Sequence, residues 1–245
     1  MKLIKNLILK TLFNFGYQLV KMKTDEYFFY RDLVKKKSPI LFDVGANQGQ
    51  SIDRFRKIFP NVITHSFEPT PKLVKILEEK YSDENTKILP FAVSDKLANV
   101  SLNVYDTIEE GVGNSLHNLN EEYPAKFLRK EKIRSITLDS YAKEAKITEI
   151  DILKIDVQGH EIQVLNGAKK LLSENSIKII ELEMMFDNTY DVNVPFYEIE
   201  KILNPLGYRI YCFPTVRNLK NGKLSWVDAV YVSEGIYNKN LIDGR

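Results

Sequence analysis

The chain has 245 residues, of which 44% are hydrophobic and 28% are charged, a composition that fits one α/β domain with a sizeable core. Lysine and arginine number 35 against 33 acidic residues. The formal net charge is therefore only +2, and no large overall field draws the protein to nucleic acid or to an anionic membrane. The single cysteine, Cys212, excludes an intrachain disulfide and favours a reducing compartment, so we expect a cytoplasmic protein.

The first segment, residues 1–21, predicts an amphipathic helix. Its apolar residues recur every three or four positions, and lysines interrupt any continuous apolar run. A signal peptide would need such a run and a cleavage site of small residues, so we expect no export. We interpret residues 1–37 as a helical appendage that docks on the domain or on a second subunit, and its basic flank leaves peripheral membrane contact open.

Residues 38–245 alternate strand and helix patterns. In the first half we expect strand 39–43, helix 50–59, strand 62–67, helix 72–81 and strand 87–93. Residues 100–105 suggest a hairpin insertion or an extra strand. The polar stretch 106–132 is too long for a plain connection, so we interpret it as a substrate loop or lid.

The second half continues the same rhythm. The expected elements are strand 150–155, helix 160–172, strand 177–183, helix 195–203, strand 208–213 and strand 226–232. The Asn221-Gly222 pair between the last two strands favours a tight hairpin turn. The last strand of the sheet should therefore be antiparallel.

The turn after the first strand indicates a nucleotide-type cofactor pocket. Gly45 and Gly49 allow close approach of a ligand, and the next strand ends at Glu68, a carboxylate able to accept hydrogen bonds from two ribose hydroxyls. The dinucleotide pattern is incomplete, because Ser51 stands where its last glycine would be. Asp43 would repel a phosphate but attract an ammonium or sulfonium group, which favours S-adenosylmethionine.

Several blocks of the sequence resemble the FkbM family of methyltransferases. They are Asp43-Val44-Gly45-Ala46-Asn47-Gln48-Gly49, Phe67-Glu68-Pro69, Ala92-Val93-Ser94-Asp95, Thr137-Leu138-Asp139-Ser140 and the run from Leu153 to Glu161. The resemblance implies a class I methyltransferase fold, which is a Rossmann-like α/β sheet, mostly parallel with an antiparallel last strand. It also implies S-adenosylmethionine as methyl donor and, usually, O-methylation of a hydroxyl on a sugar or natural product.

The same resemblance predicts which residues hold the cofactor. The methionine portion should lie among Asp43, Gly45, Asn47 and Ser51, in the turn that Gly49 completes. Glu68 should bind the ribose hydroxyls. Ala92 and Val93 should border the adenine.

Catalytic candidates follow the next two strands. Methyl transfer to an alcohol needs close alignment and removal of a proton from the attacking oxygen. We take His160 as the first candidate base, because its ordinary pKa near 6.5 leaves it mostly neutral at physiological pH. Asp156 and Glu183 are the carboxylates expected near the methyl group or the acceptor. Glu161 is expected either to join them or to stabilise the first turn of its own helix.

Other interpretations stay open. Carboxylates of this kind also bind Mg²⁺, but no ligand spacing favours it, so we name no metal ligand. His65 is expected inside the second strand and His117 is expected to face water. A nicotinamide-dependent oxidoreductase or a non-catalytic binding module would share the fold, although Tyr141 lacks the lysine of a Tyr-x-x-x-Lys pair. A glycan or another small molecule is the expected acceptor, and a homo-oligomer remains possible.

Overall fold

The computed structural model describes residues 27, 29–106, 114–121, 125–187, 189–191 and 195–243. The predicted helix of residues 1–21 lies outside the described residues, as do residues 107–113 and 122–124 of the predicted substrate loop. No helix in the described ranges is long and apolar enough to cross a bilayer.

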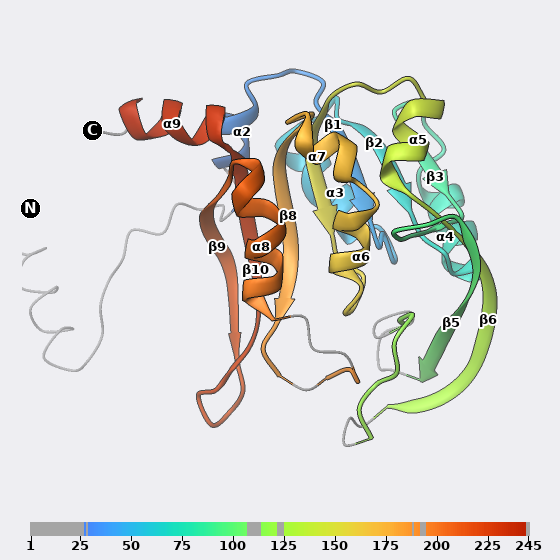
Figure 1. Cartoon of the computed structure of the whole chain (residues 1–245). Coiled ribbons are helices and arrows are strands. Elements are labelled where there is room, and N and C mark those ends of the chain that lie inside the picture. Colours follow the sequence, from blue (N-terminus) through green and yellow to red (C-terminus); the bar gives the residue numbers. More distant parts are fainter. Residues whose placement is uncertain are drawn as a thin grey trace, which may run out of the picture.

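A seven-stranded sheet with the order β3-β2-β1-β7-β8-β10-β9 forms the centre of the molecule (Figure 1). Its strands are β1 Ile40–Val44, β2 Ile63–Phe67, β3 Thr86–Leu89, β7 Ile150–Ile155, β8 Ile177–Met185, β9 Tyr208–Asn218 and β10 Leu224–Ser233. The first five are parallel to one another, whereas β10 is antiparallel to both β8 and β9. The structure therefore confirms the predicted α/β sheet with an antiparallel last strand.

Helices cover both faces of this sheet. They are α2 Phe29–Val34, α3 Gln50–Ile58, α4 Pro71–Lys80, α5 Leu138–Glu144, α6 Glu161–Asn166, α7 Lys169–Ser173, α8 Phe196–Leu203, the short 3₁₀ helix Asn204–Leu206 and α9 Glu234–Asp243. Alternate residues of β1 point to opposite cores, because Phe42 packs with α5 to α8 and Leu41 packs with α2 and α3. All six residues of β7 are buried, as expected for a central parallel strand.

A smaller sheet follows β3 and differs from the prediction. It consists of β4 Ala92–Val93, β6 Lys126–Ile136 and β5 Ala98–Asp106, in that order. The strand predicted over 87–93 is thus two strands in two sheets, because Pro90 has no N–H to continue the first ladder. The loop predicted over 106–132 is wrong from Lys126 onward, where β6 pairs antiparallel with β5. Most of the first half of β6 is exposed and charged, so its sequence lacks the apolar alternation that marks a strand.

The helix predicted over 160–172 is also interrupted. Helix α6 ends at Asn166 and α7 begins at Lys169. Gly167 lies between them, and a Cβ on it would be 2.0 Å from the carbonyl oxygen of Ser94. The close approach of this backbone to the residues after β4 separates the two helices and brings Ser94 next to α6.

Candidate active site

The turn after β1 brings the ends of three strands together. Gly45 and Ala46 donate backbone hydrogen bonds to the carbonyl of Phe67 at 3.0 and 3.1 Å, and the N–H of Asp156 donates to Val44 at 3.0 Å. Gly45 has φ 85, and a Cβ on it would lie 1.9 Å from the Asp156 carbonyl oxygen. Only glycine fits this position, where β1 meets the end of β7.

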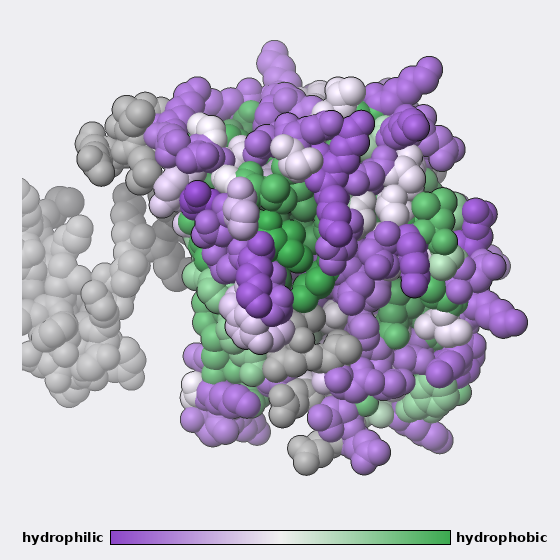
Figure 2. Space-filling model, in the orientation of Figure 1, coloured by the Kyte–Doolittle hydropathy of each residue, from purple (hydrophilic) through white to green (hydrophobic). Residues whose placement is uncertain are grey.

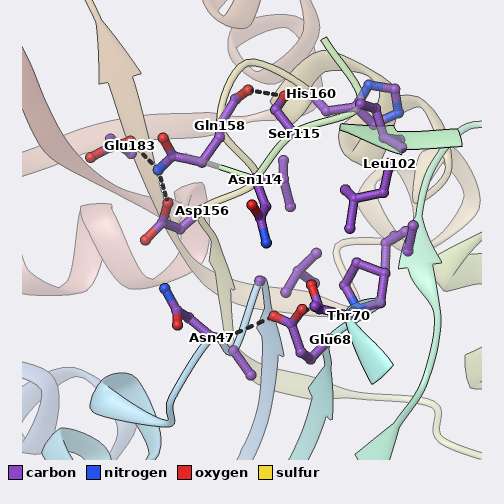
Figure 3. Close-up of a pocket in the computed structure, with 18 of the residues that line it drawn as sticks. Asn47, Glu68, Thr70, Leu102, Asn114, Ser115, Asp156, Gln158, His160 and Glu183 are labelled. Carbon is purple, nitrogen blue, oxygen red and sulfur yellow. Dashed lines mark hydrogen bonds between the residues drawn. The ribbon is translucent and has the colours of Figure 1, made fainter. Parts of the chain in front are cut away.

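A cavity of about 290 Å³ opens at the carboxyl ends of these strands (Figure 3). Many of the predicted site residues line it together, namely Gly45, Asn47, Ser51, Glu68, Ala92, Val93, Asp156, His160 and Glu183. Asp43 and Gly49 do not line it. Asp43 is fully buried within β1, and Gly49 packs against the ring of Tyr81, whose hydroxyl donates to the Gly49 carbonyl at 2.8 Å.

Two backbone donors fix the carboxylate of Glu68. Its Oε2 accepts a hydrogen bond from the N–H of Asn47 and its Oε1 accepts one from the N–H of Thr70, both at 2.9 Å. Burial raises the pKa of this carboxyl, while the hydrogen bonds from Thr70 oppose the rise. Each oxygen keeps a lone pair after these contacts, so Glu68 can accept two further hydrogen bonds from a ligand in the cavity.

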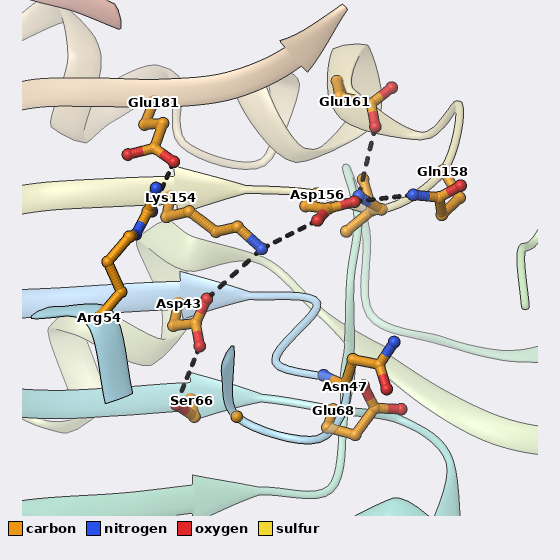
Figure 4. Close-up of polar contacts among 12 residues, drawn as sticks. Asp43, Asn47, Arg54, Ser66, Glu68, Lys154, Asp156, Gln158, Glu161 and Glu181 are labelled. Atoms are coloured by element: carbon orange, nitrogen blue, oxygen red, sulfur yellow. Dashed lines mark hydrogen bonds and ion pairs between the residues drawn. The ribbon is translucent and has the colours of Figure 1, made fainter. Parts of the chain in front are cut away.

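A row of polar side chains crosses the sheet beneath the cavity (Figure 4). Ser66, Asp43, Lys154 and Glu181 occupy neighbouring register positions on β2, β1, β7 and β8. The Lys154 ammonium lies 3.8 Å from Asp43 Oδ1 and 3.1 Å from Asp156 Oδ2. The burial of Lys154 is thus compensated by two carboxylates, one below the cavity and one lining it.

The row continues to α3 through a second buried ion pair. Arg54 lies 2.5 Å from Glu181 Oε1, and the hydroxyl of Tyr30 donates to the other oxygen of Glu181. Neither Arg54 nor Glu181 lines the cavity. Glu181 is therefore part of the packing between α2, α3 and the sheet.

One amide bridges two carboxylates that line the cavity, Asp156 and Glu183. Gln158 Nε2 donates to Asp156 Oδ1 at 2.8 Å and to Glu183 Oε2 at 3.2 Å, while Gln158 Oε1 accepts from the hydroxyl of Tyr190 at 2.7 Å. Burial raises the pKa of Glu183 well above its ordinary value, and the negative charge of Asp156 raises it further. Burial alone would raise the pKa of Asp156 as well, but the Lys154 ammonium lowers it.

His160 lies on the other side of the cavity and both its nitrogens have partners. Ser94 Oγ donates to Asp95 Oδ1 at 3.1 Å, so it accepts from His160 Nε2, which is 2.9 Å away. His160 Nδ1 is then unprotonated and accepts from His117 Nε2 at 3.0 Å. Burial, with a smaller contribution from the nearby His117, lowers the pKa of His160 to about 4. The ring is therefore neutral at physiological pH, but His117 occupies its basic lone pair.

The remaining predicted residues have structural contacts. His117 was expected to face water but is half-buried against His160. His65 lies in β2 as predicted, with Nδ1 2.7 Å from the hydroxyl of Tyr141. Glu161 Oε1 accepts from the N–H groups of Val157 and Gly159 at 3.3 and 3.2 Å, so it stabilises the turn before its helix. Burial raises the pKa of Glu161 to about 7.

Two residues that line the cavity, Lys154 and Gln158, were not predicted as site residues from the sequence. Lys154 is one of two charged residues, with Asp151, in the otherwise apolar strand β7, and a charge in such a strand is the sequence signal that could have marked it as a partner for buried carboxylates. Gln158 adopts φ 56. Its role as a bridge depends on Glu183, which is distant in sequence and close only in the folded protein.

The cavity fits S-adenosylmethionine. Asn47 lines it, and the side-chain oxygen of Asn47 is buried without a hydrogen-bond partner among the described residues, which leaves an acceptor for an ammonium group. Three carboxylates and one ammonium line the cavity, a balance that suits a cationic sulfonium. Val93, Leu102 and Leu116 supply an apolar border for a flat base. Within the described ranges, no group of three or more His, Cys, Asp or Glu side chains is arranged to hold a metal ion.

Comparison with known proteins agrees with this geometry. The family model of the methyltransferase FkbM domain matches residues 43–210, which is more than half of the chain. The 2-O-methyltransferase NoeI of Sinorhizobium fredii (strain NBRC 101917 / NGR234) is 25% identical over 180 residues, covering 70% of this chain and 73% of that protein.

Solved structures resemble the chain at low sequence identity. A TehB-like SAM-dependent methyltransferase from Corynebacterium glutamicum gives a TM-score of 0.44 at 9% identity, covering 94% of this chain and 96% of that one. The fibrillarin pre-rRNA processing protein of Methanococcus jannaschii gives 0.47 at 15% identity, covering 81% and 68%. From the family match, the chain belongs to the FkbM family of methyltransferases and its cofactor is S-adenosylmethionine.

Proposed function

We propose that this enzyme transfers a methyl group to a hydroxyl oxygen of a sugar, a glycan or a related small molecule. The observation that carries the proposal is Glu183, a carboxylate with a raised pKa that lines the cavity and is held by Gln158. An alcohol must lose a proton as its oxygen attacks, and a base with a raised pKa accepts that proton more readily. The name of the relative NoeI, a 2-O-methyltransferase, supports oxygen as the methylated atom.

The residues of the cavity divide this task. Bound S-adenosylmethionine supplies an electrophilic methyl group on a sulfonium. Glu68, held by the N–H of Asn47, would accept hydrogen bonds from the ribose hydroxyls, and the buried side-chain oxygen of Asn47 would accept one from the ammonium group. Asp156 remains ionised beside Lys154, and its charge favours the cationic cofactor.

Glu183 is the base that the geometry favours over His160. Among the described residues, hydrogen bonding to the Glu183 carboxylate involves Gln158 at Oε2, so Oε1 is the oxygen that accepts the proton of the acceptor hydroxyl. His160 would first have to break its hydrogen bond with His117 to present a lone pair. Its low pKa also makes it a weaker base.

The test is to incubate the full chain with S-adenosylmethionine carrying a ¹³C-methyl group and a panel of glycans and sugars. Matched compounds in which an amine or a thiol replaces the hydroxyl serve as controls. We expect a new O-¹³CH₃ resonance with a hydroxyl acceptor and none with its amine or thiol counterpart. Transfer to nitrogen or sulfur with the hydroxyl compounds left unmodified would overturn the proposal.

A further inference from the structure

Two strand ends project beyond the cavity on the same side of the molecule. The hairpin that joins β9 and β10 and the β5–β6 pair both extend past the carboxyl edge of the central sheet, one on each side (Figure 1). We name them the β9–β10 tip, residues 216–223, and the β6 tip, residues 126–130. The cavity lies at the same edge, because its walls follow the ends of β1, β2 and β7.

Register positions show how far each tip extends. Glu183 pairs with Asp228, which pairs with Thr215, and β9 continues for three more residues to Asn218. On the other side, Asn103 forms a β-bridge with Ser115, which lines the cavity. Asn103 also pairs with Lys130 of β6, and the strand extends from there back to Lys126. At about 3.3 Å per residue, each tip reaches roughly 10 Å beyond the level of the cavity.

Both tips carry exposed apolar side chains. Phe127 and Leu128 in the β6 tip are 48% and 46% exposed, and Val216 and Leu219 in the β9–β10 tip are 53% and 41% exposed. Three more exposed side chains lie near this edge, namely Phe186 just after β8 and Phe196 and Tyr197 at the start of α8. With the four residues of the tips, they make up most of the exposed large hydrophobic side chains of the described residues. Figure 2 shows hydrophobic surface along β9 that gives way to hydrophilic side chains toward the hairpin end. Such clustering at one edge marks an interaction surface.

Both tips are also basic, unlike the chain as a whole. The β6 tip contains Lys126, Arg129 and Lys130, the β9–β10 tip contains Arg217, Lys220 and Lys223, and neither contains an acidic residue. Among the described residues, only Arg129 of these six forms an ion pair, with Glu131. Of the nearby acidic residues, Asp106 pairs with Lys126 across the β5–β6 ladder, and Asp187 and Asp191 accept hydrogen bonds from Ser225 and Asn118.

We propose that the two tips dock the enzyme on an anionic lipid bilayer, with the cavity facing the membrane between them. Apolar side chains flanked by lysine and arginine bind such a surface by inserting into the interface and pairing with anionic headgroups. Aliphatic side chains such as Leu128, Val216 and Leu219 offer no face on which a nucleic-acid base could stack. Resting on the proposed function, this assigns the acceptor to a class, namely a hydroxyl carried by the headgroup of a membrane lipid.

The experiment is co-sedimentation of the full chain with phosphatidylcholine vesicles, with and without phosphatidylglycerol. The variants are Lys220→Glu with Lys223→Glu, and Phe127→Ser with Leu128→Ser. Lys143→Glu with Lys169→Glu controls for net charge, and Leu97→Ser, at the opposite end of β5, controls for lost apolar surface.

We expect wild type and both controls to bind vesicles that contain phosphatidylglycerol, and each tip variant to bind at least about tenfold more weakly. A tryptophan placed by Leu219→Trp should shift its emission to the blue on vesicle addition, and one placed by Leu97→Trp should not. Absence of binding by the wild type, or equal binding by tip variants and controls, would overturn the docking surface. Preferential binding to RNA over vesicles would also overturn it.

S-adenosylmethionine affinity and methyl transfer to soluble glycans are measured in the same proteins. The tip variants should retain both activities, since the tips do not line the cavity. A tip variant that loses vesicle binding but still methylates soluble glycans supports the docking surface and leaves the proposed function unchanged. Vesicle binding without transfer to any hydroxyl would contradict the proposed function instead.

Discussion

Gln158 donates one amide hydrogen bond to Glu183 Oε2 at 3.2 Å, and its backbone adopts the left-handed conformation with φ 56. A second hydrogen bond from the same amide holds Asp156, and Tyr190 fixes the amide oxygen. The two carboxylates are thus kept close although both carry, or can carry, a negative charge. This closeness is one cause of the raised pKa of Glu183.

Glu183→Gln should lower kcat by about 100-fold to 10,000-fold, because it removes the group that accepts the acceptor's proton. The affinity for S-adenosylmethionine should stay within a few-fold, since glutamine keeps the shape and can still accept from Gln158. Single-turnover transfer of a labelled methyl group and calorimetry measure the two quantities. Glu174→Gln is the control, because Glu174 is exposed and follows α7 directly. Wild-type turnover in Glu183→Gln would remove Glu183 as the base.

The pH dependence of activity should report the same carboxyl group. Turnover requires ionised Glu183, so kcat should fall as the pH drops through its raised pKa. In Asp156→Asn the charge that helps to raise this pKa is gone, while Lys154, which lowers it, remains. The acidic limb of the pH–rate profile should therefore move to lower pH in this variant. A limb that stays in place would show that another group controls it.

The sequence predicted those parts of the site that local patterns determine. The strand that ends at Val44, the glycine turn and the strand that leads to Glu68 follow from apolar runs and from residues with special backbone freedom. The polar row and the Gln158 bridge were not predictable in this way. Asp43 and Lys154 are neighbours only because β1 and β7 pair in one particular register.

The errors in the fold have the same origin. Strand β6 is held by its ladder with β5 and by the burial of its last residues, so its exposed first half has no apolar periodicity to detect. The interruption between α6 and α7 depends on the backbone near Ser94, which is far away in sequence. In each case a tertiary contact determined the local structure.

Arg54→Met should reduce the free energy of unfolding by about 3–5 kcal/mol, because it leaves Glu181 buried without its cation. Adding Glu181→Gln should recover most of this loss, since the glutamine oxygen can still accept from Tyr30. Urea unfolding of the single and double variants measures the difference. Arg56→Met on the same helix breaks the more exposed pair with Asp83 and should cost less than about 1 kcal/mol. Equal losses at the two arginines would contradict a buried role for Arg54.

Glu161 should make stability depend on pH. Burial raises its pKa to about 7, so between the unfolded value near 4.5 and pH 7 the folded state holds more protons than the unfolded state. The stability associated with the neutral carboxyl is present below about pH 4.5 and is lost as the pH rises through 7. Glu161→Gln stays neutral and should gain about 2 kcal/mol relative to wild type between pH 5 and pH 8. Urea unfolding at both pH values tests this, and a constant difference would refute it.

The measurement that tests the cavity most directly is calorimetric titration of S-adenosylmethionine into the wild type and Glu68→Ala. The wild type should bind, and Glu68→Ala should bind at least about tenfold more weakly because two ribose hydroxyls lose a fixed carboxylate acceptor. Urea unfolding of both proteins should show that the variant is folded. Equal affinity in two folded proteins would contradict the cofactor position on which the proposed methyl transfer depends.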